Sequence, residues 1–119
     1  MNFIIHKQGK YPVAELQRGS YKINTVQDAL DLMAEADYRG ARRIIIYREQ
    51  MCPEFFELRS GVAGEILQKF SIYSMRLAIV GDLAGYNSKS LKDFIYESNK
   101  TGRILFLSTA DEAINKLSA

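Results

Sequence analysis

The fold is decided by three short apolar stretches, Ile44-Ile45-Ile46-Tyr47, Leu77-Ala78-Ile79-Val80 and Ile104-Leu105-Phe106-Leu107. A strand with one face in water alternates apolar and polar residues, whereas a strand covered on both faces is apolar throughout. The three stretches are therefore predicted to be strands covered on both faces. Such strands are typical of parallel sheets, in which helices form the connections.

Apolar residues at helical spacing lie between these strands. Small polar residues that can cap a helix precede each such segment, at Asn24 or Thr25, at Ser60, at Ser90, and at Ser108 or Thr109. Serine, threonine and asparagine at these places accept hydrogen bonds from the free N–H groups of the first turn. Gly40 and Gly102 are expected to end the first and third helices, because glycine readily takes the conformation that stops a helix. The result is an alternation of helices and strands.

Two further strands are predicted before this alternation, within residues 2–6 and 11–17. Gly9 and Lys10 lie between them, and a glycine at this place favours a tight hairpin. The predicted fold class is α/β: a small, open, mostly parallel sheet of about five strands, in which an opening hairpin is followed by alternating helices and strands. Residues 1–119 are expected to form a single domain.

The composition excludes several classes of protein. The 119 residues include 16 Lys and Arg and 14 Asp and Glu, for a net charge of +2, so no nucleic-acid partner is expected. The one cysteine, Cys52, and the one histidine, His6, provide neither a disulfide nor a zinc site, and we predict no metal and no cofactor. No apolar run approaches the roughly 20 residues of a membrane span or the length of a secretory signal. A cytoplasmic protein is expected.

A small basic cluster at Arg39, Arg42 and Arg43 has Tyr38 and Tyr47 nearby. Arginines beside aromatic residues can bind a nucleic-acid backbone. The alternative, which we favour, is a solvated helix end at which the arginines interact with the negative end of the helix dipole.

Polar residues follow the predicted parallel strands, where open α/β sheets bind their ligands. The candidate ligand or partner site comprises Glu49, Cys52, Phe55, Phe56, Ser60, Asp82, Ser108 and Thr109. Helix starts at this edge could hold a small anion, and Glu49 and Asp82 could act in polar recognition or as an acid–base pair. The competing interpretation is that the serines, threonine and aspartate only cap helices. A role for Cys52 as a nucleophile would need its thiolate stabilised by the helix that starts at Pro53.

Phe55, Phe56 and Leu58 form an apolar group on a short helix that a minimal α/β fold does not need. Such an insert can be a self-association surface or the lid of a pocket. It can also simply cover the edge of the sheet.

Four segments identify a family resemblance: VQDALDLMA at 26–34, GARRII at 40–45, GVAGEILQKFS at 61–71 and SKSLKDFIYESN at 88–99. They resemble the bacterial domain-of-unknown-function family numbered four-one-eight-zero. This resemblance implies no activity, substrate or catalytic residue.

The order of elements also resembles STAS domains, the type found in sulphate transporters and anti-sigma factor antagonists. In the antagonists a serine at the start of the helix after the third strand is phosphorylated. The resemblance places Ser60 at this position and makes it a possible phosphosite. Leu58 and Arg59 depart from the acidic residue and the serine of the family's motif, and residues 52–58 are an insertion.

The function itself is left open by the sequence, so two hypotheses stand. The first is a non-enzymatic, cytoplasmic binding or regulatory module of STAS-like fold, a homo-oligomer and most simply a homodimer, whose protein contacts lie around Phe55, Phe56 and Ser60. The second is a small-molecule binder or enzyme that uses the carboxyl ends of the parallel strands, at Glu49, Asp82 and Ser108. No membrane partner is expected.

Overall fold

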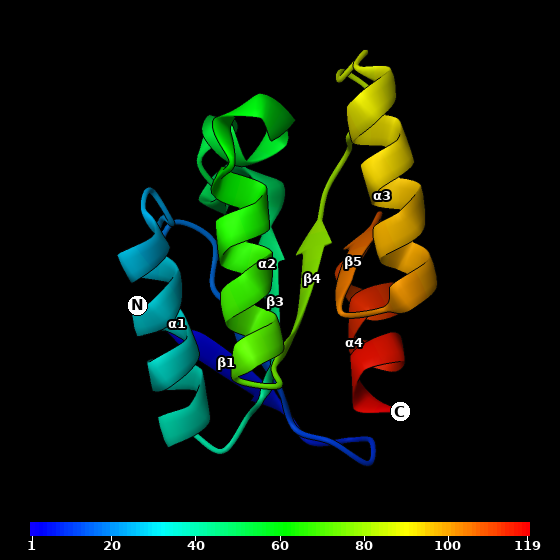
Figure 1. The fold of residues 1–119 in the computed structure, drawn as a ribbon. Coiled ribbons are helices and arrows are strands. Elements are labelled where there is room, and N and C mark those ends of the chain that lie inside the picture. The colour runs from blue at the N-terminus through cyan, green and yellow to red at the C-terminus, as the bar shows by residue number, and fades with distance from the viewer.

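A computed structural model describes all residues, 1–119, and has a five-stranded open sheet in the order β1-β2-β3-β4-β5 (Figure 1). The strands are β1 (Phe3–His6), β2 (Val13–Leu16), β3 (Arg43–Tyr47), β4 (Arg76–Val80) and β5 (Ile104–Leu107). The opening hairpin of β1 and β2 is antiparallel, and the other neighbours are parallel. The predicted α/β fold class is confirmed.

Four helices cover the two faces of the sheet. They are α1 (Val26–Tyr38), α2 (Val62–Ile72), α3 (Lys89–Thr101) and α4 (Ala110–Ser118). The first three are the crossovers between successive parallel strands, and all lie in front of the sheet in Figure 1, with α4 behind. Crossovers of one hand that add strands in one direction place their helices on a single face. No helix of the protein has the length and apolar character needed to cross a bilayer.

The apolar strands are buried on both faces, as their composition predicts. Ile44 and Ile46 of β3 belong to the large core beneath α1, α2 and α3, whereas Ile45 and Tyr47 belong to the smaller core beneath α4. Successive side chains of a strand point to opposite faces. One strand therefore supplies both cores.

Two of the expected helix caps are confirmed. The Thr25 side chain accepts from the Asp28 N–H and the Asp28 carboxylate accepts from the Thr25 N–H, which closes a capping box. Thr109 caps α4 by accepting from the Glu112 N–H. The expected start of the third helix at Ser90 was wrong, because Ser88 is the residue that caps α3.

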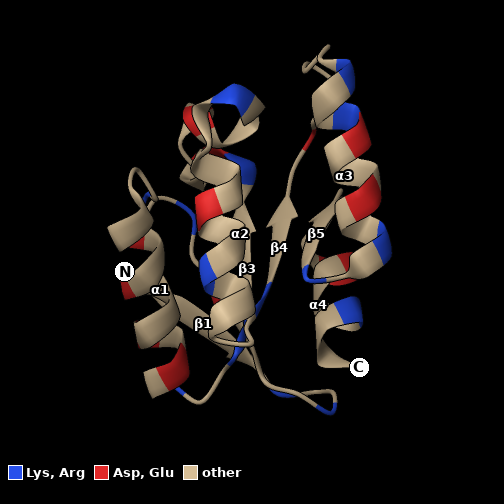
Figure 2. Cartoon of the chain, viewed as in Figure 1, with Lys and Arg blue, Asp and Glu red and all other residues tan.

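Arginines at the amino ends of the strands bind the carbonyl ends of helices. Arg43 donates to the Leu117 carbonyl of α4 at 2.6 Å, and Arg76 donates to the Gly102 carbonyl that follows α3 at 2.9 Å. Arg42 donates to the Tyr73 carbonyl after α2 and forms an ion pair with Asp37. The arginines thus interact favourably with the negative helix ends. Figure 2 shows both Lys or Arg and Asp or Glu along α3, so the surface of this helix is not uniformly basic.

The segment 51–60, here called the insert, joins β3 to α2 and contains two short 3₁₀ helices, Pro53–Phe56 and Leu58–Ser60. Phe55 is fully buried and Phe56 is 4% exposed. The Phe55 ring lies 6.4 Å from the Phe106 ring of β5. The predicted contact surface around Phe55 and Phe56 is therefore corrected: both rings bury their apolar area in the core, so they offer no exposed apolar patch.

Candidate functional site

A cleft of about 1000 Å³ opens between the insert and the start of α3. It lies at the carboxyl end of the sheet, where both segments reach the upper end of the molecule in Figure 1. Its lining includes Phe56, Arg59 and Ser60 from the insert and Tyr86, Asn87 and Ser88 from the segment that leads into α3. We call it the insert cleft. Two neighbouring hollows at the same end of the sheet are smaller, about 520 and 270 Å³.

Aromatic side chains form the apolar wall of the insert cleft. The rings of Phe56 and Tyr86 are stacked, with 5.1 Å between their centroids, and Phe55 packs edge-on against Phe56. Burial and stacking hold these rings in place. The insert is therefore joined to the loop before α3 by packed rings, and the cleft between them has a fixed wall.

The polar side of the insert cleft carries one cation, Arg59, and one carboxylate, Glu57. Arg59 is exposed and takes part in none of the ion pairs of the protein. Arginine presents several N–H donors in a planar fork that suits carboxylate and phosphate groups. Arg59 is thus available to an anion in the cleft.

The starts of two helices also border the insert cleft. Ser60 donates its hydroxyl to the Glu54 carbonyl at 2.6 Å and accepts from the Val62 N–H of α2 at 3.2 Å. Ser88 accepts from the Leu91 N–H of α3 at 3.2 Å. These hydroxyls satisfy one N–H group at each helix start, and helix starts leave further N–H groups without an intrahelical partner. Both helices also direct the positive end of their dipole toward this side.

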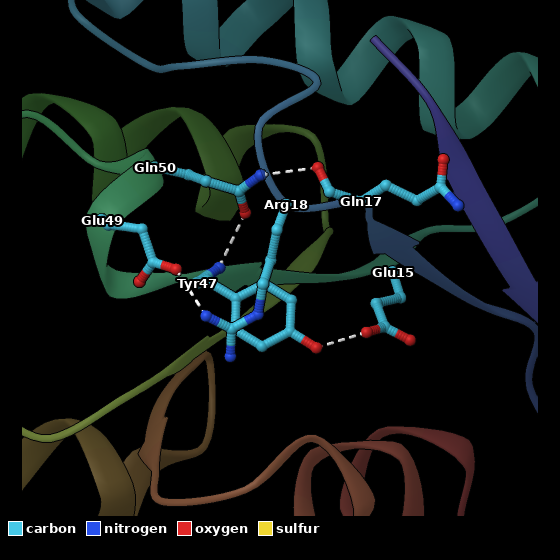
Figure 3. A network of polar contacts seen from close by, with 6 residues as sticks. All are labelled: Glu15, Gln17, Arg18, Tyr47, Glu49 and Gln50. Atoms are coloured by element: carbon cyan, nitrogen blue, oxygen red, sulfur yellow. Dashed lines mark hydrogen bonds and ion pairs between the residues drawn. The ribbon is translucent and has the colours of Figure 1, made fainter.

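Glu49 belongs to a different part of the carboxyl edge, a network between the loops after β2 and β3 (Figure 3). Its carboxylate pairs with Arg18 at 2.6 Å, and the Arg18 guanidinium lies over the Tyr47 ring at 3.8 Å. Gln50 accepts from the Tyr47 N–H at 2.9 Å and donates to the Gln17 carbonyl at 2.8 Å. The network joins the two loops and borders the hollow of about 520 Å³.

Glu15 is the centre of this network on the sheet itself. The Tyr47 hydroxyl donates to its carboxylate, and His6 bonds the other carboxylate oxygen at 2.8 Å. Burial raises the pKa of the Tyr47 hydroxyl, and the adjoining Glu15 carboxylate raises it further. Tyr47 therefore stays protonated and keeps its hydrogen bond. Sequence reasoning missed this group, although a carboxylate between Ala14 and Leu16 in an apolar strand was the available signal.

Asp82 and Ser108 share the smallest of the three hollows, about 270 Å³, between α3 and the end of β5. The Asp82 carboxylate accepts from the Ala84 N–H at 2.8 Å, and Thr109 serves as the cap of α4. The candidate residues therefore lie along one edge but in separate places: Ser60 and Phe56 at the insert cleft, Glu49 in the loop network, Asp82 and Ser108 beside β5.

Cys52 belongs to the first part of the insert, lies in the large core and is 3% exposed. Burial raises the pKa of its thiol, and the nearby Glu54 carboxylate raises it as well. The thiolate is the reactive form of cysteine. The geometry therefore gives Cys52 no nucleophilic character. The structure also brings no three His, Cys, Asp or Glu side chains together as a metal-binding group.

Comparison with known proteins shows a family but no activity. No curated protein matches the chain. The family model described as domain of unknown function (DUF4180) matches residues 8–117, which extend from the hairpin loop into α4. Both the insert cleft and the loop network lie within the matched residues. His6 of β1, which bonds Glu15, lies before them. The chain belongs to the DUF4180 family.

Proposed function

We propose that the protein is a non-enzymatic, cytoplasmic binding module that holds a small anionic molecule in the insert cleft. The observation that carries this proposal is the free Arg59 in a cleft of about 1000 Å³ at the carboxyl end of a parallel sheet. Open α/β sheets bind ligands at this end, and small-molecule sites commonly measure about 300 to 1000 Å³.

The surroundings of Arg59 support an anion with an apolar or aromatic part. Two helix starts border the cleft beside Arg59, and both favour negative charge. The partly exposed Tyr86 ring, stacked on the buried Phe56, gives the cleft an apolar side. A phosphate or carboxylate attached to a ring fits this combination. The ligand would thus lie beside Ser60, where a protein contact was expected, and would be a small molecule, as expected for the carboxyl ends of the parallel strands.

A thermal-unfolding screen tests the proposal, because a ligand that prefers the native protein raises its Tm. The probes are inorganic phosphate and nucleoside monophosphates, measured on the wild-type protein, on Arg59→Gln and on the control Lys22→Gln. Lys22 is exposed and forms no ion pair, so the control removes the same charge elsewhere.

Arg59→Gln should weaken binding by about tenfold, the equivalent of losing one charged hydrogen bond. Lys22→Gln should bind as the wild type does. A nucleoside monophosphate is expected to raise the Tm more than inorganic phosphate does, because only the former has a ring that can pack against the partly exposed Tyr86. Equal Tm shifts in both variants, or no shift with any probe, would contradict an anion site at Arg59.

Phosphorylation of Ser60, which the likeness to STAS antagonists predicts, is a second proposal for the same cleft. Ser60 is exposed and lies next to Arg59 at the start of α2, where a phosphate would meet a positive helix end. Intact-mass spectrometry of protein purified from its native cells tests it. A phosphorylated species that Ser60→Ala abolishes supports the proposal, and an unmodified chain under all growth conditions rejects it.

A further inference from the structure

The outer edge of β1 carries backbone groups that no strand of the protein uses. β1 is the end strand of the sheet. The Asn2 carbonyl accepts from the Gln17 N–H at 2.8 Å, so Asn2 is turned toward β2. In an antiparallel pair, alternate residues direct both backbone groups to the same side. Phe3 and Ile5 therefore direct their N–H and C=O groups away from β2, toward the free edge.

The residues of this edge read nearly the same in both directions: Asn2, Phe3, Ile4, Ile5 and His6, with three apolar residues between two polar ones. Two identical antiparallel strands related by a two-fold axis pair residue i with residue j and j with i, so this pattern brings apolar residues opposite apolar ones and polar opposite polar. We propose that the free edge of β1 binds β1 of a second copy of this chain, and that the two sheets become continuous across a two-fold axis at Ile4.

The register follows from the backbone groups and the side chains together. With the axis at Ile4, Phe3 of each copy forms a hydrogen-bonded pair with Ile5 of the other, and both residues have outward backbone groups. Ile4 then faces Ile4 of the second copy, and Asn2 faces His6. A shift of the axis to Ile5 would place Ile4 opposite His6 and Phe3 opposite Lys7. The first register pairs apolar with apolar residues and keeps them on matching faces.

Exposure and charge agree with this register. Ile4 is 43% exposed, so its apolar surface gains burial when it meets a second Ile4. The two Lys7 side chains lie at opposite ends of the paired strands and do not meet each other. The polar contact of His6 with Glu15, 2.8 Å long, lies on the β2 side and does not need to break.

The other end of the sheet limits the assembly to two copies. The free side of β5 is occupied by the side chain of Asn99, which accepts from the Phe106 N–H at 2.8 Å and donates to the Phe106 carbonyl at 3.2 Å. The N–H and C=O groups of Phe106 are therefore unavailable to the β1 edge of a neighbour. Pairing of unlike edges would produce an open fibre, whereas pairing of β1 with β1 closes after two copies.

Sedimentation equilibrium of the full chain tests the inference on the wild type, on Ile4→Lys and on the control Ile72→Lys. Ile72 is 60% exposed on α2, so both changes replace an exposed isoleucine by a lysine. The wild type should be a dimer, and Ile4→Lys should raise its dissociation constant by about tenfold or more, because two lysines then meet on the axis. Ile72→Lys should remain a dimer. A monomeric wild type, or a dimer that Ile4→Lys leaves intact, would overturn the inference.

A disulfide tests the register. Directly opposite residues of a non-hydrogen-bonded antiparallel pair have Cα atoms about 4.5 Å apart, within the range that a disulfide spans. Oxidised glutathione should therefore join two copies of Ile4→Cys in a Cys52→Ala background, with each thiol giving up its proton and glutathione taking up the two electrons. Ile72→Cys in the same background should stay unlinked. Equal linking of the two variants, or none at Ile4→Cys, would refute the register.

Discussion

The two side edges of the sheet are finished in different ways. At β5, the carboxamide of Asn99 bonds both backbone groups of Phe106 and takes the place of a further strand. At β1, the outward groups of Phe3 and Ile5 meet no strand, and the exposed Ile4 lies beside them. An open edge is a site for pairing with another chain, and proteins commonly block the edges that they do not use. The comparison indicates that β5 is closed to association and that β1 is left available for it.

The largest effect should come from opening the closed edge with Asn99→Leu. The change leaves the N–H and C=O groups of Phe106 without partners, and Phe106 is 6% exposed. Leaving such buried groups unpaired costs about 2 kcal/mol of unfolding free energy, which urea denaturation measures. Light scattering should also show association that grows with protein concentration, because the edge is now free.

The matched control for this change is Asn115→Leu on the exposed side of α4. Surface substitutions away from buried hydrogen bonds usually change stability by less than about 0.5 kcal/mol. If both variants lose the same stability and neither associates, Asn99 does not close the edge of β5.

A smaller effect is expected when β1 is loosened from its neighbour. Glu15→Ala removes the shared partner of His6 and the Tyr47 hydroxyl, two groups that lie partly or largely buried. We expect a loss of about 1 kcal/mol and faster hydrogen exchange of the β1 amides. The control Glu97→Ala removes an exposed carboxylate of α3 that forms no ion pair. Unchanged exchange in β1 after Glu15→Ala would show that the backbone ladder alone holds this strand.

The smallest effect is the loss of stability at alkaline pH that arises from Tyr47, the residue whose hydroxyl bonds Glu15 beside β1. The pKa of Tyr47 is raised above its usual 10.0 by burial and by Glu15, so folding favours the neutral phenol. Its contribution to stability is fully present below about pH 10, and it is lost as pH rises through the raised pKa of the folded state. Tyr47→Phe should reduce the alkaline loss of stability, measured by denaturation between about pH 9 and 11. The 87% exposed Tyr38 provides the control, Tyr38→Phe, whose profile should follow the wild type.

Local chemistry was enough to predict most of the fold. The continuous apolar composition of β3, β4 and β5 predicts burial on both faces, and the structure confirms it. Thr25 was predictable as a cap because a capping box depends on residues only three apart. Ser88 was missed in favour of Ser90 because two serines stand close together before the same apolar residues, and spacing along the chain does not choose between them.

The candidate site was less predictable, because its members come from distant segments. Because open α/β sheets bind ligands at the carboxyl ends of their strands, Ser60, Glu49, Asp82 and Ser108 were predicted to share one edge. The structure divides them among the insert cleft, the loop network and the hollow beside β5. The burial of Phe55 depends on Phe106, which is distant in the sequence. A pair of adjacent phenylalanines on a short helix is equally compatible with a lid, a contact surface or a core, so their composition alone could not decide.

By itself, the sequence determined the elements, their parallel order and the edge of the sheet at which polar residues gather. These follow from hydrophobic periodicity and capping, which act over a few residues. Only the tertiary structure decided that Arg59 is free, that Glu15 joins His6 to Tyr47, and that Asn99 closes one edge while β1 stays open. Each of these depends on a contact between elements, and no pattern within a single element specifies which side chain of another element will meet it.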